Sequence, residues 1–420
     1  MLDIKFIREN PNLVKRGCEN KGVKVDIEKL LKLDEERRQC LFQLEKKRAE
    51  INQISDLVSK EKDLKKREEL IEKAKKIKKE IQEKEKVFRE IESQFKELMY
   101  QIPNLPLAEV PVGKDERENV VLREVGEKPK FDFQPRDYLE IAEKLDLIDI
   151  KRASKISGTR FGILKRELVL LEFALINFAL EKLLKEGFIP VLPPVLLKEE
   201  MMRGMGYLEQ LDRQEAYYLE KDRLYLVGTS EQSLGTMHAN EIFEEKELPK
   251  RYVGFSTCFR REAGSWGKET WGIFRVHQFD KIEMFSFCRP QDSKKEHQFF
   301  LQMEEKLMQA LKLPYRVVQI CTGDLGFPAA SKYDIETWLP SKGEYRETHS
   351  TSNCTDFQAR RLNIRYRQKN NKLEFVHTLN GTVFAIGRIL IAIIENYQQK
   401  DGSFLVPEVL QKYFKLKKIG

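Results

Sequence analysis

Apolar residues recur with a helical period over residues 27–101, in a block that is otherwise charged. In the second half of the block they return every three or four positions, which is the spacing of a heptad seam. Lys84 is the one polar position in that seam, and the polar segment Ser59–Arg67 separates it from a similar run before it. We therefore predict two long helices that pair as an antiparallel coiled coil. The apolar positions are Leu30, Leu33, Leu41, Leu44, Ile51, Ile54 and Val58, then Leu70, Ala74, Ile77, Ile81, Phe88, Ile91, Phe95 and Leu98.

Basic residues gather near the polar tip of this pair, which favours contact with phosphate groups. Acidic residues are interleaved with them, and a heptad seam alone is equally typical of an oligomerisation coiled coil, so both interpretations stay open. A Pro-rich segment at 102–113 ends the helical block and predicts a boundary between residues 1–102 and 103–420. The basic tip residues are Lys60, Lys62, Lys65, Lys66 and Arg67.

Two strands are predicted between Thr257 and Phe287, where apolar and charged residues alternate on both sides of a Gly-rich turn at 264–267. Side chains on a strand change face with every residue, so Arg260 and Glu262 would share a face. One face of the second strand would carry Arg275, His277, Phe279, Lys281 and Glu283, and the other Phe274, Val276, Ile282 and Met284.

A face of this composition suits a bound nucleotide. Guanidinium groups bind phosphate oxygens in pairs, an aromatic ring stacks on a base, and carboxylates bind an ammonium group or a bridging metal ion. A salt-bridged face in solvent is the alternative interpretation.

Other segments place polar residues beside apolar elements. A strand from Leu224 ends at Thr229, Ser230 and Glu231, where hydroxyl and carboxylate groups can hold an ammonium group or can cap a helix. A buried helix is predicted at Glu167–Lys185, and a surface helix is predicted at Leu301–Leu311. We further predict a strand that ends at Arg346-Glu347, a turn at Asn380-Gly381, and a buried helix that opens at Gly387-Arg388.

Composition narrows the class of protein. The 420 residues are 41% hydrophobic and 34% charged, with a net charge of +8 from 76 basic and 68 acidic residues, a balance that does not by itself decide for nucleic acid. Six widely spaced cysteines form no Cys-x-x-Cys pair, so neither a disulfide framework nor a zinc site is expected. Without a signal segment or an apolar run of about 20 residues, we expect a cytoplasmic protein with no membrane partner.

Three segments resemble the motifs of one enzyme family. FRRE followed by RVHQFDKIEM resembles motif 2 of class II aminoacyl-tRNA synthetases in the form found in seryl-tRNA synthetases. GFIPVLPPVLLKEEM resembles motif 1, with Pro194 as its proline, and HTLNGTVFAIGRILIAIIENYQ resembles motif 3. The resemblance covers essentially the whole chain. It implies an α+β fold: an antiparallel two-helix coiled-coil arm that binds tRNA in residues 1–102, then a class II synthetase catalytic domain of antiparallel sheet flanked by helices in residues 103–420.

The resemblance also implies an activity. Seryl-tRNA synthetases are ligases that activate L-serine with ATP and Mg²⁺ to seryl-adenylate and pyrophosphate. They then transfer serine to the 3′ end of tRNA(Ser), which the arm grips. Motif 1 implies a homodimer. The resemblance leaves open whether tRNA(Sec) is a second partner.

The family's site residues carry over to matching positions. Arg260 would bind the α-phosphate, and Arg275 and Arg388 would bind the β- and γ-phosphates. The ATP set comprises Arg260, Arg261, Glu262, Val276, Phe279, Glu347, Thr348, His349, Ser350 and Arg388, with Glu347 also on the metal ion. The serine set comprises Thr229, Ser230, Glu231, Arg260, Glu283 and Thr382.

This chain departs from the family pattern at a few positions. His349 stands where relatives commonly have a small hydroxyl residue, and Trp266 and Trp271 stand where relatives usually have a small residue and an arginine. One of the tryptophans could stack on a base of the tRNA acceptor end, or the loop could pack against its own domain. Two other functions stay open: a related ligase that loads a carrier protein, and a non-catalytic RNA-binding scaffold.

Overall fold

The computed structural model describes residues 1–209, 212–263 and 271–420. The chain divides into two compact units. One comprises residues 2–19 and 23–102, and the other comprises Met1, residues 20–22 and residues 103–420. No helix among the described residues is both long enough and apolar enough to cross a membrane.

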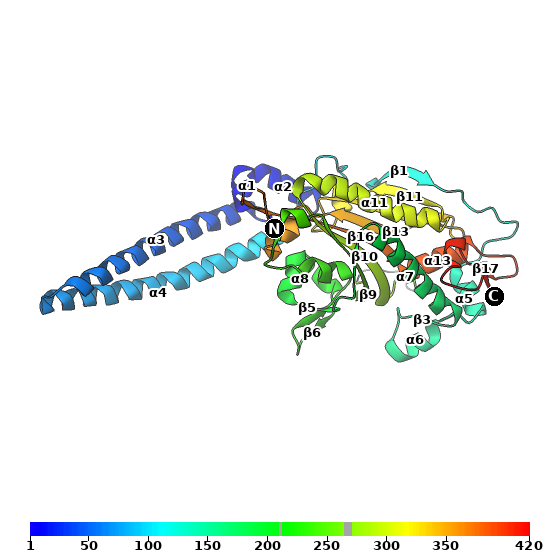
Figure 1. The fold of residues 1–420 in the computed structure, drawn as a ribbon, viewed down its shortest axis with the longest axis horizontal. Helices are drawn as coiled ribbons and strands as arrows, with labels where there is room; N and C mark the ends of the chain where they lie inside the picture. Colours follow the sequence, from blue (N-terminus) through cyan, green and yellow to red (C-terminus); the bar gives the residue numbers. More distant parts are fainter. Residues whose placement is uncertain (210–211, 264–270) are drawn as a thin grey trace. The chain divides into compact units, whose positions relative to one another are not determined.

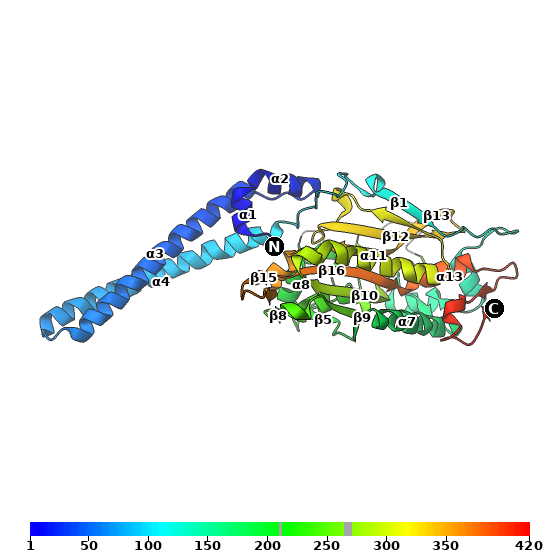
Figure 2. The same cartoon turned by 45° about the horizontal axis from the view of Figure 1, so that its top comes forward.

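The first unit is an antiparallel pair of long helices with two short helices before it (Figure 1). The long helices, α3 and α4, lie side by side in both views (Figure 2). Asp26 and Asp63 cap their first turns by accepting hydrogen bonds from backbone N–H groups. The sequence prediction of a helical hairpin is therefore confirmed. The bounds are α1 Ile4–Glu9, α2 Pro11–Asn20, α3 Ile27–Lys60 and α4 Leu64–Gln101.

The second unit is built on an eight-stranded sheet with the order β1-β11-β12-β13-β16-β10-β9-β4. Neighbouring strands are antiparallel except for β4, which pairs with β9 in parallel at one edge. The strands are β1 Val120–Val125, β4 Ile189–Val191, β9 Lys250–Phe259, β10 Gln278–Cys288, β11 Tyr315–Gln319, β12 Ser331–Leu339, β13 Glu344–Asn353 and β16 His377–Ala385.

Short strands and helices surround this sheet. The short strands are β2 Ile148–Asp149, β3 Ile163–Leu164, β5 Leu196–Lys198, β6 Tyr218–Leu219, β7 Leu224–Leu226, β8 Ile242–Glu244, β14 Arg365–Arg367, β15 Leu373–Phe375, β17 Phe404–Leu405 and β18 Lys418–Ile419. The helices are α5 Tyr138–Lys144, α6 Ile150–Ser157, α7 Glu167–Lys185, α8 Glu199–Met205, α9 Asp212–Glu215, α10 Ser230–Thr236, α11 Ser293–Ala310, α12 Phe357–Leu362 and α13 Ile386–Asn396.

The alternation along β10 separates two cores. Ile282 and Met284 point into the main core, which also takes the apolar faces of α7, α11 and α13. Phe285 and Phe287 point to the opposite face, into a smaller core beneath α8, α10 and α12. The odd-numbered positions nearer the start of β10, Phe279, Lys281 and Glu283, line the candidate site instead.

Two local predictions were wrong. The helix predicted at Leu301–Leu311 begins at Ser293 and is largely buried, because its apolar face packs on the sheet. Asn380-Gly381 lies inside β16 instead of forming a turn. Gly381 is needed there for close approach, because a Cβ would stand 3.1 Å from the Glu304 side chain.

The strands of the Thr257–Phe287 segment are also shorter than predicted. β9 ends at Phe259 and β10 begins at Gln278, so Arg260, Glu262 and Arg275 lie outside the sheet. Glu262 has a φ of +50°, which ends the extended conformation at that residue. The whole Gly-rich turn at 264–267, with Trp266, falls outside the described residues.

Candidate active site

A cavity of about 410 Å³ opens above β10, β13 and β16. Charged side chains from separate parts of the chain converge in it. Arg275 and Arg388, paired with Glu262 and Glu347, make up a cation-rich end, and Glu231 and Glu283, beside Lys281, make up a carboxylate end. The sequence-predicted residues among its lining are Thr229, Glu231, Arg260, Glu262, Arg275, Val276, Phe279, Glu283, Glu347, Thr348, Ser350, Thr382 and Arg388.

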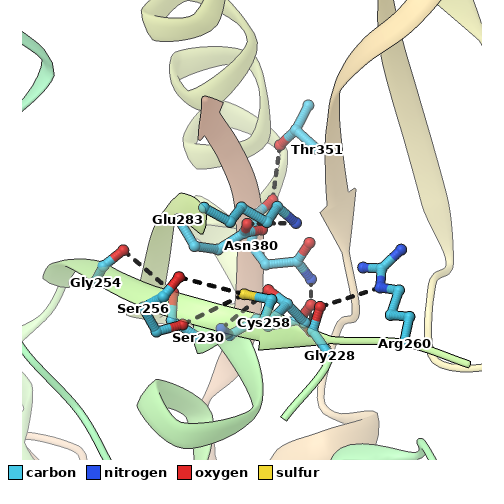
Figure 3. A network of polar contacts seen from close by, with 12 residues as sticks. Gly228, Ser230, Gly254, Ser256, Cys258, Arg260, Glu283, Thr351 and Asn380 are labelled. Carbon is cyan, nitrogen blue, oxygen red and sulfur yellow. Dashed lines mark hydrogen bonds and ion pairs between the residues drawn. The ribbon is translucent and has the colours of Figure 1, made fainter. Parts of the chain in front are cut away.

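Arg260 stands at the centre of the cavity and is fixed from two sides. Its Nε donates a hydrogen bond to the Gly228 carbonyl oxygen at 3.1 Å, and its guanidinium carbon lies 5.5 Å from the centroid of the Phe279 ring. Figure 3 shows Arg260 beside Gly228 at the end of β9. Since Nε is engaged, the terminal nitrogens of the guanidinium group can face a ligand in the cavity.

Two further arginines pair with carboxylates at the cation-rich end. Arg275 Nη1 lies 3.1 Å from Glu262 Oε2. Arg388, in the first turn of α13, donates to the Glu347 carbonyl oxygen at 2.9 Å and lies 3.4 Å from its carboxylate. Arg388 also stacks 4.9 Å from the Phe274 ring centroid. This end of the cavity therefore offers oriented cations and aromatic rings to a polyanionic ligand.

A β-bulge at Thr348 decides which residues of β13 face the cavity. Glu347 pairs with Glu336 and His349 pairs with Ile335, so Thr348 is the extra residue. The bulge changes the phase of alternation, and Glu347, Ser350 and Ser352 all line the cavity while His349 does not.

His349 instead lies in the main core. Its ring is 1% exposed and packs edge-on against Phe384, with centroids 5.9 Å apart. Burial lowers the pKa of His349 to about 3, so the ring is neutral. It forms a 2.9 Å hydrogen bond with the Thr348 hydroxyl, which puts it one residue away from the cavity.

Glu347 is the carboxylate best suited to a cation. Desolvation acts to raise its pKa, but the charges of Arg388, Lys332 and Arg260 outweigh that effect and lower the pKa of this carboxylate, whose side chain is 48% exposed. Among the described residues, no group of three or more His, Cys, Asp or Glu side chains could hold a metal ion. One ionised carboxylate beside Ser350 does fit Mg²⁺, which keeps several waters and takes its remaining ligands from substrate phosphates.

The carboxylate end of the cavity centres on Glu231, in the first turn of α10. Glu231 Oε2 accepts from the Tyr207 hydroxyl at 2.7 Å, and Oε1 accepts from Asn380 at 3.0 Å and Gln358 at 3.3 Å. Burial, followed by the negative charge of Glu283, raises the pKa of Glu231 to about 7. Thr229 is the N-cap of this helix, which confirms the capping interpretation, and it also lines the cavity, while its contact with an ammonium group stays a prediction.

Glu283 faces Glu231 from β10. It is 1% exposed, and burial raises its pKa. Thr382 is its partner across the β10–β16 ladder, so two residues that were predicted to bind the substrate serine lie side by side. Figure 3 shows Glu283 beside Asn380, whose carbonyl oxygen accepts from the Thr351 hydroxyl at 2.9 Å.

Two other predicted residues lie outside the lining. Ser230 is fully buried, and its hydroxyl donates to the Gly254 carbonyl oxygen at 3.2 Å. Arg261 is exposed, with its guanidinium group 4.7 Å from the Tyr217 ring centroid. Trp271 is 54% exposed and is not among the lining residues.

The sequence reasoning missed several lining residues. Lys281 was visible in the alternation of β10 but received no role. Tyr207, Lys332 and Asn380 gave no signal, because each comes from a segment whose approach to the cavity depends on the tertiary fold.

Comparison with known proteins defines the class first. The family model described as the tRNA synthetase class II core domain (G, H, P, S and T) matches residues 217–397, which include the central strands and most of the cavity lining, so the fold is that of a class II aminoacyl-tRNA synthetase. The model of the seryl-tRNA synthetase N-terminal domain matches residues 1–106. The chain belongs to the seryl-tRNA synthetase family.

Full-length relatives agree. The chain is 46% identical to the serine–tRNA ligase of Dictyoglomus thermophilum, covering 100% of this chain and 99% of that protein. The seryl-tRNA synthetase of Pyrococcus horikoshii, solved in complex with ATP, has a TM-score of 0.91 and 42% identity and covers 100% of this chain and 99% of that one. The cytoplasmic serine–tRNA ligase of Naegleria fowleri, in complex with AMP, has a TM-score of 0.86 and 35% identity, and the match covers 100% of this chain and 98% of that one.

Proposed function

We propose that the protein is a serine–tRNA ligase that forms seryl-adenylate from L-serine and ATP and then transfers serine to the 3′ end of tRNA(Ser). One observation carries this proposal: Arg260 interacts electrostatically with Glu262 and Glu347 at the cation-rich end and with Glu283 at the carboxylate end of a single cavity. ATP fits the first end and the ammonium group of an amino acid fits the second. The reacting carboxylate and α-phosphate would then meet at Arg260.

The reaction requires positioning and charge neutralisation more than proton transfer. The serine carboxylate attacks the α-phosphorus, a new P–O bond forms, and the bond to the departing pyrophosphate breaks. Arg260 would stabilise the charge that develops on the α-phosphate, while Arg275 and Arg388 would hold the β- and γ-phosphates. Phe279 would stack on the adenine.

Mg²⁺ would bind at Glu347 together with Ser350 and the nucleotide phosphates. When bound, it would neutralise phosphate charge during the departure of pyrophosphate. The low pKa of Glu347 supports this assignment, because the carboxylate stays ionised throughout the neutral range.

The serine end would discriminate by its buried polar groups. Glu283 and Glu231 would hold the α-ammonium group, and Thr229 and Thr382 supply hydroxyl groups nearby. A smaller amino acid without a hydroxyl would leave such groups unpaired, which rejects it strongly.

The partners follow from the two units. The helical hairpin α3–α4, with lysines at its tip, would grip tRNA(Ser) through phosphate contacts. A homodimer is supported by exposed apolar side chains on α7 and β4, which include Phe173 at 55% exposure. Aminoacylation assays with tRNA(Ser) and tRNA(Sec) in parallel will decide whether the second tRNA is also charged.

The first test is pyrophosphate exchange into ATP with each amino acid in turn and no tRNA. We expect exchange with serine alone. Arg260→Ala should lower kcat about 100-fold or more, the range for loss of one oxyanion-stabilising group. The control Arg367→Ala, on β14 outside the cavity lining, should retain wild-type exchange.

Other outcomes separate the remaining functions. Exchange with a different amino acid would overturn the serine assignment. Exchange with serine but transfer only to a carrier protein would favour the carrier-loading ligase. A folded protein that binds tRNA but shows no exchange would favour the non-catalytic scaffold.

A further inference from the structure

Lys281 is a buried cationic residue to which the proposed reaction gives no role. It lies in β10 between Phe279 and Glu283, on the face that lines the cavity, and it is 9% exposed. Its Nζ is 2.6 Å from Glu283 Oε2. Lysine is almost never buried unless it is paired, so the ion pair accounts for its position in the structure.

Glu283 lies among charges from every element packed around it. Glu231 approaches from α10 and Glu304, fully buried, from α11, and burial followed by the negative charge of Glu283 raises the pKa of both. Burial raises the pKa of Glu283 itself. The charge of Lys281 opposes that increase most strongly, and the charge of Arg260 and the Thr229 hydroxyl also act to lower the pKa of Glu283. Lys281 is thus the nearest positive charge in a group of three buried carboxyl groups.

Stability does not explain such a pair. Removing two charges from water costs several kcal/mol per ion, and an apolar pair of similar volume is often at least as stable. The ammonium group of Lys281 is, however, chemically equivalent to the α-ammonium group of an amino acid. Lys281 forms an ion pair with Glu283 Oε2, but no hydrogen bond from a described residue reaches that oxygen, so the carboxylate keeps hydrogen-bond capacity for a second ammonium group.

We propose that Lys281 is a positioning residue of the amino-acid end of the site, which holds the Glu283 carboxylate ionised and oriented for the α-ammonium group of the substrate. This inference rests on the proposed function. Without Lys281, Glu283 would take up a proton at a higher pH and would bind an ammonium group less well as the pH falls.

The test is serine-dependent pyrophosphate exchange between pH 5.5 and 8.5. In Lys281→Met we expect the KM for serine to rise at least tenfold at pH 7, with the KM for ATP within about threefold of wild type. The acid limb of kcat/KM for serine should move up by about one pH unit, which corresponds to a tenfold change in proton affinity. Lys281→Arg, which keeps the charge, should restore the limb to its wild-type position.

Lys250→Met is the matched control. Lys250 is also a strand lysine in an ion pair, with Glu247 at 3.2 Å, but it lies at the start of β9 and does not line the cavity. Its replacement should therefore leave the acid limb for serine unmoved.

Lys281→Gln gives a second neutral variant should the methionine variant fail to fold, and circular dichroism reports folding for each. An unmoved acid limb in a folded neutral variant would overturn the proposal, as would equal losses in the KM values for serine and ATP. If neither neutral variant folds while Lys281→Arg does, Lys281 is structural and the proposal is also overturned. Absence of serine-dependent exchange in the wild type would instead refute the proposed function.

Discussion

The surroundings of the Glu231 carboxylate shift its pKa in opposite directions. Tyr207, Asn380 and Gln358 donate hydrogen bonds to it, which favours the ionised form. Burial and the nearby charge of Glu283 disfavour that form more strongly and raise the pKa to about 7. An unfolded chain would ionise the same group near pH 4.5, so folding carries a cost for Glu231 that grows as the pH rises from 4.5 to 7.

Glu231→Gln should therefore stabilise the protein at pH 8 while it weakens serine activation. The gain should be on the order of 3 kcal/mol above pH 7, since each pKa unit corresponds to about 1.4 kcal/mol, and it should vanish below pH 4.5, where both states are protonated. Thermal melting at pH 8 and pH 4.5 measures it. Glu408→Gln, at a side chain that is 81% exposed, is the control and should show no pH-dependent gain. An equal gain at both pH values would contradict this account.

At the scale of elements, the sequence predicts periodic segments well and interruptions of the period poorly. The helix predicted at Glu167–Lys185 has those bounds in the structure, because its apolar positions keep one period throughout. The alternation of β10 placed Phe279 and Glu283 on the cavity face and Ile282 and Met284 in the core.

The errors fall where backbone geometry departs from the period. Phe274 and Val276 were assigned to the face opposite Arg275, yet all three line the cavity, because this segment is not a strand. The bulge at Thr348 separates His349 from the cavity, and no residue type in GEYRETHSTSN announces it. A pattern that assumes a regular strand cannot locate an extra residue, because bulge pairing depends on the neighbouring strand.

The polar seam position in α4 provides a test at this scale. Lys84 Nζ donates to Gln43 Oε1 at 2.6 Å across the helix pair, at a position where the heptad predicts an apolar side chain. Lys84→Ile should stabilise the hairpin by about 1 kcal/mol through added apolar burial. Hydrogen exchange in α3 and α4 of the full-length protein should then slow about fivefold. Lys86→Ile, at an exposed position off the seam, should give no such protection, and equal protection by both variants would contradict the seam argument.

At the scale of the whole molecule, α7 carries two apolar faces. Leu168, Leu171 and Leu175 are buried in the main core. Leu170, Phe173 and Leu184 recur at helical spacing on another face, and each is at least 50% exposed. Ile189 and Leu192, at 46% and 80% exposure, continue this apolar surface along the edge strand β4 and just beyond it. Contiguous apolar surface of this kind marks an interaction site, and a twofold axis would bury the same face of two copies against each other.

We therefore expect the wild type to sediment as a dimer with twice the 49.6 kDa mass of the chain. Phe173→Glu places a charge in the middle of the apolar stripe of α7, where pairing of two copies would bury both carboxylates without partners, so this variant should sediment as a monomer at micromolar concentration. Leu122→Glu is the matched control, because Leu122 is an apolar residue, 43% exposed, on the opposite edge strand β1. It should leave the dimer intact. A monomeric wild type, or a dimer lost equally in both variants, would show that the α7 face is not the interface.

Since β10 and β9 separate β4 from β16 in the sheet, serine activation by the Phe173→Glu monomer would further show whether the cavity needs the second copy.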